Sequence, residues 1–273
     1  MKSIHLLLCA VLFALVLGQN YESQRTKFPD ARKPYSGSFA ASWLGGFCFK
    51  SGKCDAQSLE DWDRESFTIH GLWPNPKATR RFDFFDVDNI HDKSLLDDMN
   101  NYWPANSKPS DPKREYFWLW EHEYDKHGKE YSELLQAYKP QEFSTASTQV
   151  LQERFFRDAI NFYKRYPLTK LNISKANPRP EVNRFGELIV TKQQLSDIIG
   201  INKQNFIVSC GRGNDWMFEI QICLRFQEDL SITLEKCSNI LKETPYPTKD
   251  TCPDIFRLIG YKPRGAKRVT AKA

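Results

Sequence analysis

Long apolar runs are missing from this 273-residue sequence after its first eighteen residues. In that first stretch Lys2 gives a positive start, residues 4–17 are almost wholly apolar, and Val16-Leu17-Gly18 supplies the small residues where signal peptidases cut. A membrane anchor is the alternative, but the run is short for a span and no second run follows. We therefore expect residues 1–18 to be a cleaved signal peptide.

Linkers, repeats and low-complexity segments are also missing, and no charge of one sign dominates. Loss of the signal removes Lys2, which leaves 38 basic and 34 acidic residues and a formal charge of +4. This modest charge does not point to a nucleic-acid binder, although a polyanionic substrate stays compatible with it. We expect one domain over residues 38–260, an extension over residues 19–37, and a solvated basic tail over residues 261–273 that could also assist capture of a polyanion.

The cysteines include no Cys-x-x-Cys pair, which argues against a zinc site. Cys9 is lost with the signal, and an even set remains, which predicts three disulfides in an exported chain with fifteen possible pairings. The six are Cys48, Cys54, Cys210, Cys223, Cys237 and Cys252. Asn172-Ile173-Ser174 is the only acceptor motif for N-glycosylation, and the prolines that follow it suit an exposed loop.

Apolar patterns predict strands over residues 38–49, 65–73, 206–209 and 218–226, of which the last alternates most clearly. Asp111 and Pro112 predict the start of a helix that Gly128 ends or bends, and a second amphipathic helix is predicted over residues 151–162.

A capping box at Thr191 and Gln194 predicts a short helix that Gly200 closes. Helices in the middle of the chain, strands at both ends and no regular βαβ alternation together predict an α+β fold. In that fold a largely antiparallel sheet packs against several helices.

Four ionisable side chains gather in the predicted helix, at His122, Glu123, Lys126 and His127. At 100° per residue they fall within an arc of about 140°, and such crowding is electrostatically awkward unless a site uses it. A solvated charged face is the alternative, but the aromatic run over residues 116–120 favours a buried helix. Metalloprotease helices place their second histidine four residues after the first, whereas here the spacing is five, so we expect no metal.

A second candidate is His70, in Phe67-Thr68-Ile69-His70-Gly71-Leu72-Trp73-Pro74. A single histidine in a strand is more often structural than catalytic. Here, however, Gly71 permits close backbone approach, and Trp73 offers an aromatic surface on which a base could stack. His91 lies in a polar stretch and is expected at the surface.

These two segments resemble the active-site segments of the ribonuclease T2 family of secreted, metal-independent ribonucleases. Residues 67–74 match all eight positions of the first segment, and the second keeps the histidines, glutamate, lysine and glycine in register. The resemblance covers residues 38–255. Weaker similarities within it lie at Trp43 and Cys48, Tyr102-Trp103-Pro104, and Glu219, Ile220 and Cys223.

The resemblance implies an endoribonuclease that cleaves single-stranded RNA to 2′,3′-cyclic phosphates and then to 3′-phosphates, without a cofactor. By resemblance His127 would be the base, His70 the acid and Glu123 an assisting catalytic residue, while His122, Lys126 and Trp73 would bind substrate. The implied disulfides are Cys48–Cys54, Cys210–Cys252 and Cys223–Cys237. We expect a monomer, not attached to a membrane after signal cleavage, in the secretory pathway and then outside the cell or in a vacuolar or lysosomal lumen.

The chain departs from the family pattern beside the second segment, where Lys129-Glu130 replaces the usual Thr-Cys. The partner cysteine is also missing from residues 105–109, so one family disulfide is lost as a pair, and with it a stabilisation of about 2–4 kcal/mol. Four positions that shape base pockets or support the helix also differ, so base preference does not carry over. They are Ser42, Leu44, Leu119 and Tyr124.

Two other functions compete with this interpretation. A catalytically silent RNA-binding or storage protein could keep the same scaffold, but its mark would be a missing histidine or lysine, and none is missing. A secreted metal-dependent hydrolase is the other, and sensitivity to EDTA would distinguish it.

Overall fold

The computed structural model describes residues 34–51, 67–75, 85–104, 118–166, 168, 171–211, 215–243 and 250–260. The expected signal peptide, most of the expected extension, the basic tail, Cys54, Asp111 and Pro112, and residues 105–109 lie outside this described part. The described residues from Tyr35 to Gly260 belong to a single compact unit.

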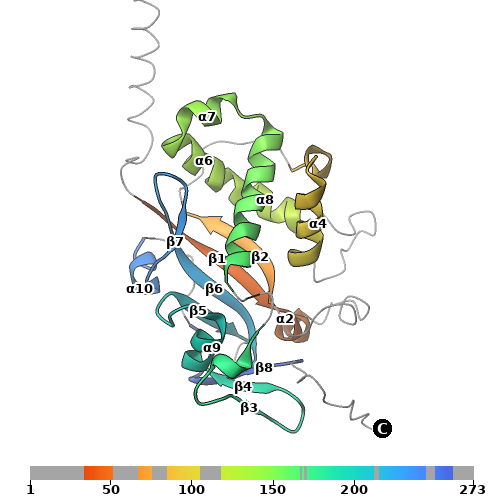
Figure 1. Cartoon of the computed structure of the whole chain (residues 1–273), viewed down its shortest axis with the longest axis vertical. Coiled ribbons are helices and arrows are strands. Elements are labelled where there is room, and N and C mark those ends of the chain that lie inside the picture. The colour runs from red at the N-terminus through yellow and green to blue at the C-terminus, as the bar shows by residue number, and fades with distance from the viewer. Residues whose placement is uncertain are drawn as a thin grey trace, which may run out of the picture. The chain divides into compact units, whose positions relative to one another are not determined.

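The main sheet of the described residues is antiparallel, with the strand order β2-β1-β6-β5 and β7 paired to β6 (Figure 1). Its strands are β1 (Tyr35–Trp43), β2 (Phe67–Pro74), β5 (Phe206–Cys210), β6 (Met217–Phe226) and β7 (Ile232–Leu234). β1 pairs along its length with both β2 and β6, so the first strand of the fold is held between an early strand and a late one.

A smaller antiparallel sheet consists of β3 (Glu181–Val182), β4 (Leu188–Thr191) and β8 (Ile255–Leu258). Helix α9 (Lys192–Ile199) follows β4, and the predicted capping box at Thr191 and Gln194 is present. Gly200 ends the helix with φ 68°, a left-handed conformation that favours glycine.

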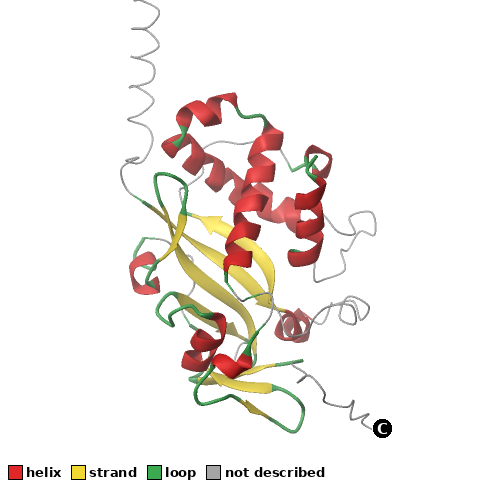
Figure 2. Ribbon diagram, viewed as in Figure 1, coloured by secondary structure: helices red, strands yellow, loops and turns green. Residues whose placement is uncertain are grey.

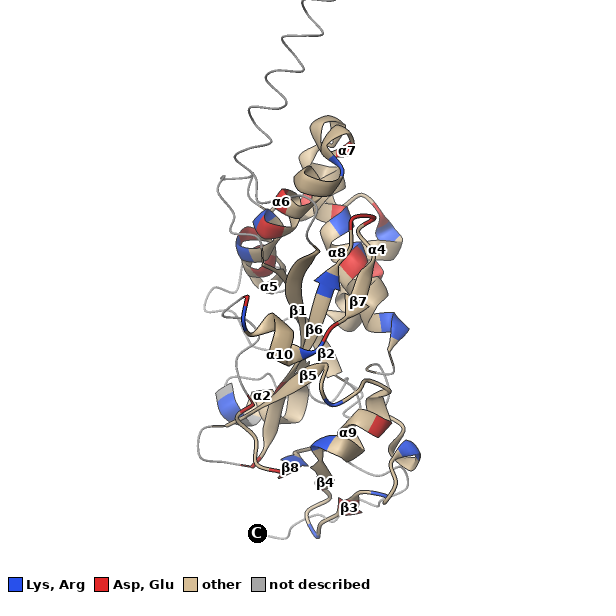
Figure 3. Cartoon of the chain, turned by 90° about the vertical axis from the view of Figure 1, so that its left-hand side faces the viewer, with Lys and Arg blue, Asp and Glu red and all other residues tan. Residues whose placement is uncertain are grey.

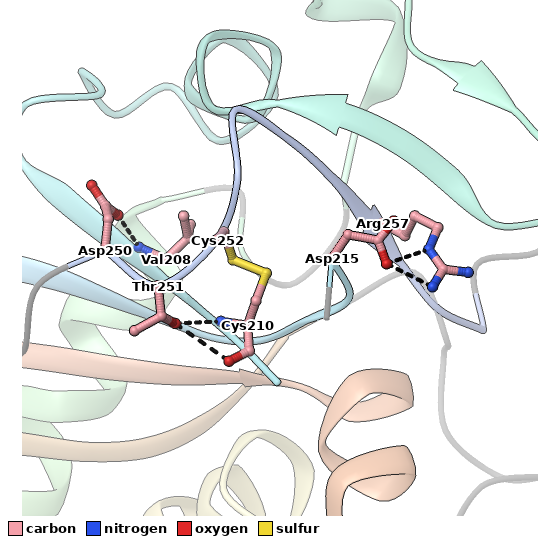
Figure 4. The surroundings of a disulfide bond; sticks show 7 residues. All are labelled: Val208, Cys210, Asp215, Asp250, Thr251, Cys252 and Arg257. Atoms are coloured by element: carbon pink, nitrogen blue, oxygen red, sulfur yellow. Dashed lines mark hydrogen bonds and ion pairs between the residues drawn. A yellow bond between two sulfur atoms is a disulfide. The ribbon is translucent and has the colours of Figure 1, made fainter. Parts of the chain in front are cut away.

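Two disulfides connect the described elements. Cys210–Cys252 joins the end of β5 to the segment before β8, where Asp250 and Thr251 also accept hydrogen bonds from backbone amides of β5 (Figure 4). Cys223–Cys237 joins β6 to the short helix α10 (Cys237–Ile240). Both pairs are those implied by the resemblance; Cys48 is also disulfide-bonded, and its implied partner lies outside the described residues.

Most of the helices form a layer beside the main sheet (Figure 2). They are α4 (Lys93–Tyr102), α5 (Trp118–Glu123), the π-helix η3 (Tyr124–Gly128), α6 (Lys129–Tyr138), α7 (Pro140–Thr145) and α8 (Thr148–Arg165), with the 3-10 turn η1 (Val87–Asn89). The 3-10 turn η4 (Ile173–Lys175) packs against α9 instead. Phe155, Ala159 and Phe162 of α8 share one core with Phe39 and Ile69 of the sheet. Each buried Phe or Ile side chain in this core contributes about 1.5–3 kcal/mol by leaving water. The expected α+β fold is confirmed.

The strand predicted over residues 38–49 is wrong at both ends. Pairing already begins at Tyr35, within the expected extension, and the strand stops at Trp43, where helix α2 (Leu44–Ser51) begins. Gly45 and Gly46 explain the change, because a Cβ atom there would lie 1.9 Å from the Ile259 carbonyl oxygen and 1.8 Å from that of Met217. The first turn of α2 therefore packs directly on other backbone segments.

Two further sequence-based predictions need correction. The second strand was predicted over residues 65–73 and is described from Phe67 to Pro74. Gly128 was expected to end or bend a helix, and the helix does not end there, because the π turn continues directly into α6. Asn172 is exposed, as a glycosylation acceptor requires, and it caps η4.

The packing of α2 generates a stability prediction. We expect Gly46→Ala to lower the free energy of unfolding by about 1–3 kcal/mol, because the added methyl group meets a backbone carbonyl that cannot move aside. Gly200→Ala is the comparison, since it has open space and only an unfavourable φ. Urea denaturation of both variants tests this, and an equal or smaller loss for Gly46→Ala would contradict it.

Candidate active site

A β-bulge places His70 in the edge strand β2. Ile69 pairs with Ala41 of β1 and Gly71 pairs with Ala40, so His70 is the extra residue between them. Its carbonyl oxygen, removed from the regular ladder, accepts a hydrogen bond from the Trp103 indole at 2.9 Å. Bulges re-aim side chains and are common next to active sites. Here the bulge interrupts the regular alternation of side chains along β2, so His70 is partly exposed while Ile69 is buried.

Glu219 of β6 is the partner of His70, across the intervening strand β1. The His70 Nδ1 and Glu219 Oε2 atoms lie 2.6 Å apart. On β1, Ser42 pairs with Glu219 and therefore shares its face of the sheet, as Ala40 does two residues away. Because both are small, the imidazole and the carboxylate can meet above the strand.

The charge of Glu219 governs the protonation of His70. Burial alone would lower the pKa of His70, but the hydrogen bond and charge of Glu219, assisted by the charge of Glu123, raise it above its ordinary value. Burial alone would raise the pKa of Glu219. The hydrogen bond and charge of His70 outweigh burial, so the pKa of Glu219 is lowered. The pair favours an imidazolium beside a carboxylate.

The second segment forms a π-helical turn beside β2. Glu123 and His127 are buried, whereas His122 and Lys126 are exposed, so the four side chains divide between two sides of the helix. Single π turns within α-helices are frequent at functional sites. Gly128 is needed inside this turn, because a Cβ atom there would lie 2.4 Å from the ring of Tyr124.

Trp73 lies between the two histidines. Its ring stacks on His127 at 5.3 Å between centroids and meets His70 edge to face at 5.2 Å. Its indole nitrogen donates to Glu123 Oε2 at 2.7 Å. Only 7% of Trp73 is exposed, so its large surface packs within the site and offers little area to a substrate base.

Gly71 provides the room for this arrangement. A Cβ atom at Gly71 would lie 2.0 Å from Glu123 Oε2 and 2.3 Å from Trp73 Nε1. The sequence suggested close backbone approach at this glycine, but the groups nearest to it are the side chains of Glu123 and Trp73. The other ring nitrogen of His70, Nε2, lies 3.6 Å from Glu123 Oε1.

His127 has an environment opposite to that of His70. Its side chain is only 3% exposed, and its Nδ1 atom lies 2.9 Å from Glu130 Oε2. Burial, followed by the positive charges of Lys126, His70 and His122, lowers the pKa of His127 to about 3. Burial raises the pKa of Glu130 to about 8, against the charge of Lys126. Burial also raises the pKa of Glu123.

The wider surroundings carry charges of both signs. Figure 3 shows acidic and basic residues side by side around α5 and α6. In the part of the chain that the structure describes, no group of three or more His, Cys, Asp or Glu side chains is placed to hold a metal ion. No helix among those residues is long and apolar enough to cross a membrane.

Comparison with known proteins decides the family. A family model described as the ribonuclease T2 family matches residues 37–237. The chain belongs to the ribonuclease T2 family. Its fold agrees, since RNase NT in complex with 5′-AMP superposes with a TM-score of 0.53 at 20% identity, over 85% of this chain and 98% of that one. The protein is thus a T2-type endoribonuclease.

Relatives within the T2 family differ in role and location. Ribonuclease 1 of Arabidopsis thaliana is 26% identical over 191 residues, 68% of this chain and 74% of that protein. A ribonuclease-like storage protein of Panax ginseng is 32% identical over 134 residues, 47% of this chain and 46% of the relative. Intracellular ribonuclease LX and extracellular ribonuclease LE of Solanum lycopersicum match at 25% and 23% identity, each over 68% of this chain and over 71% and 74% of their own lengths.

The structure brings together all six T2-type site residues predicted from the sequence, and it adds two that were not. Glu219 contacts His70 from 149 residues away, a distance that no local pattern could bridge. Glu130 contacts His127 from three residues away, and helical spacing could have found it. The four positions at which base pockets or support of the helix were expected to differ are all buried in this chain. They are Ser42, Leu44, Leu119 and Tyr124.

The pair of His70 and Glu219 generates a prediction. We expect Glu219→Gln to lower the pKa of His70, because glutamine removes the negative charge that offsets burial. An NMR titration of the His70 ring measures this, with exposed His91 as the internal reference and Glu181→Gln, in the exposed strand β3, as the matched variant. An unchanged midpoint for His70 in Glu219→Gln would rule out the assigned effect.

Proposed function

We propose that the protein cleaves single-stranded RNA by metal-free acid–base transesterification, leaving 2′,3′-cyclic phosphates that are then hydrolysed to 3′-phosphates. The observation that carries this proposal is the environment of the two histidines. They contact the same indole, yet their surroundings raise the pKa of His70 and lower that of His127. Two titratable groups whose pKa values are driven apart are suited to be an acid and a base.

The reaction begins with His127, whose neutral imidazole takes the proton of the ribose 2′-hydroxyl at Nε2. The 2′-oxygen then attacks phosphorus, and the bond from phosphorus to the 5′-oxygen breaks as His70 donates its proton to that oxygen. His70 is left neutral and His127 protonated. In the second step His70 takes a proton from water, whose oxygen attacks the cyclic phosphate. The bond from phosphorus to the 2′-oxygen breaks as His127 returns its proton to that oxygen. DNA lacks the 2′-hydroxyl and is not a substrate.

The remaining residues act on the phosphate. Lys126 and His122 are exposed beside the buried Glu123 and His127. They would bind the phosphoryl oxygens, whose negative charge grows in the transition state. Glu123 would assist the same state next to His70, at the end of the hydrogen bond from Trp73. For Trp73 we propose a positioning role between the histidines, which fits its burial better than base stacking.

The other parts of the proposal follow the sequence. Residues 1–18 would direct the chain into the secretory pathway, and the mature enzyme would act as a monomer outside the cell or in a vacuolar or lysosomal lumen. Proteins of the T2 family bind RNA or nucleotides, as the complex of RNase NT with 5′-AMP illustrates. No cofactor is needed for the reaction as written.

His70→Phe and His127→Phe test the proposal directly. Each should lower kcat for a single-stranded RNA oligonucleotide by about 10²–10⁴-fold in EDTA, because each removes one proton-transfer group. His91→Phe, which changes an exposed histidine, should leave kcat unchanged. Mass spectrometry of the products should find 2′,3′-cyclic phosphate ends.

Two results would overturn the proposal. Binding of the oligonucleotide without cleavage at any pH would favour a catalytically silent RNA-binding or storage protein on the same scaffold. Cleavage that EDTA abolishes and a divalent metal restores would favour a metal-dependent hydrolase.

Lys126→Ala should lower kcat by about 10–100-fold, less than loss of either histidine, because it removes charge stabilisation but no proton transfer. Lys203→Ala, which removes an exposed lysine from the turn before β5, is the matched control. Steady-state kinetics in EDTA measures both. A rate for Lys126→Ala equal to that of the control would remove its assigned role.

A further inference from the structure

Glu130 lies at the start of α6, one turn after His127. The distance from its Oε2 atom to His127 Nδ1 is 2.9 Å, and 27% of the Glu130 side chain is exposed against 3% of the His127 side chain. The carboxyl group thus covers one ring nitrogen of a nearly buried imidazole. It stands where the family pattern has a cysteine, so the contact comes from this chain's own sequence.

We propose that Glu130 is a positioning residue for His127: its carboxylate accepts the Nδ1 proton and thereby leaves Nε2 as the atom that receives the ribose proton. The inference rests on the proposed function, in which His127 is the base. It adds a group that selects the tautomer of that base and fixes the orientation of its ring.

The surroundings of His127 explain why such a partner is needed. The groups whose charges act on His127 are Lys126 in η3, His122 in α5 and His70 in β2, and all of them disfavour the imidazolium. Yet the imidazolium must form when the 2′-hydroxyl loses its proton. A carboxylate on Nδ1 stabilises that state, and carboxylate–histidine pairs are a common way to orient a catalytic imidazole.

The same contact makes the base sensitive to the ionisation of Glu130. A protonated Glu130 donates its hydrogen to Nδ1, and the hydrogen of neutral His127 then sits on Nε2, which can no longer accept. The pKa of Glu130 is raised to about 8 by burial. Below that pH the protonated form of Glu130 predominates, so the base becomes available as pH rises towards 8.

Glu130→Gln separates this role from a structural one. The glutamine oxygen can accept the Nδ1 proton at every pH, so the variant keeps the orientation and loses the titration. The ratio of kcat/KM for Glu130→Gln to that of the wild type cancels the titration of His70, which both proteins share. We expect this ratio to fall about tenfold for each unit of pH between 5 and 7, and to level off above a pH of about 8.

The control is Glu181→Gln, which removes the same charge from an exposed position in β3 and should give a flat ratio near one. A flat ratio for Glu130→Gln, whatever its height, would overturn the proposal, because a purely structural loss does not follow this titration.

A second measurement uses the wild-type protein alone. NMR of the His127 ring nitrogens should show Nε2 protonated at pH 6 and Nδ1 protonated at pH 9, and a proton that stays on Nε2 at pH 9 would overturn the proposal. This readout does not need turnover. If the wild type cleaves no RNA in EDTA the proposed function fails, and the nitrogen spectra still decide whether Glu130 positions His127.

Discussion

The hydrogen bond from the Trp73 indole to the Glu123 carboxylate joins the edge strand β2 to the helical layer, and the geometry of the site depends on it. Both groups are buried, so neither can replace the other with water, and an unsatisfied partner would cost about 1–3 kcal/mol. Because the indole also contacts both histidines, one rigid ring sets the spacing of the two imidazoles.

Each histidine has a carboxyl group on Nδ1, and the two pairs are tuned in different ways. His70 is 31% exposed and meets the buried Glu219, which stays ionised and holds a proton on the ring. His127 is buried among positive charges and meets Glu130, whose pKa burial raises to about 8. In both cases Nδ1 faces the paired carboxyl group and Nε2 does not. Two imidazoles thus acquire opposite pKa shifts from burial and from neighbouring charges.

Features that depend on neighbours along the chain were predictable from the sequence. The capping box of α9, the alternation of β6 and the two histidine segments are all of this kind. Features that depend on distant backbone were not. The end of β1 at Trp43 follows from the approach of Ile259 and Met217 to the glycines of α2, which the apolar run 38–49 does not reveal.

The site shows the same limit. The bulge at His70 arises from pairing with β1, and Glu219 reaches His70 only because β1 carries small residues between them. A helical wheel with 100° per residue also assumes an α-helix throughout, whereas the second segment contains a π turn. Glu130 was within reach of sequence analysis, because residues three apart on a helix can contact one another.

The π turn has a consequence for how this helix can change. A π turn holds one residue more than the α-helical turn it replaces. Deleting one residue between Tyr124 and Gly128 would restore regular hydrogen bonding, but it would rotate the preceding residues against α6 by about 100°. Either the buried face of α6 or Glu123, which accepts the hydrogen bond from Trp73, would then turn outward. Length in this segment is therefore constrained more tightly than composition, and single-residue deletions should be rarer among its descendants than substitutions.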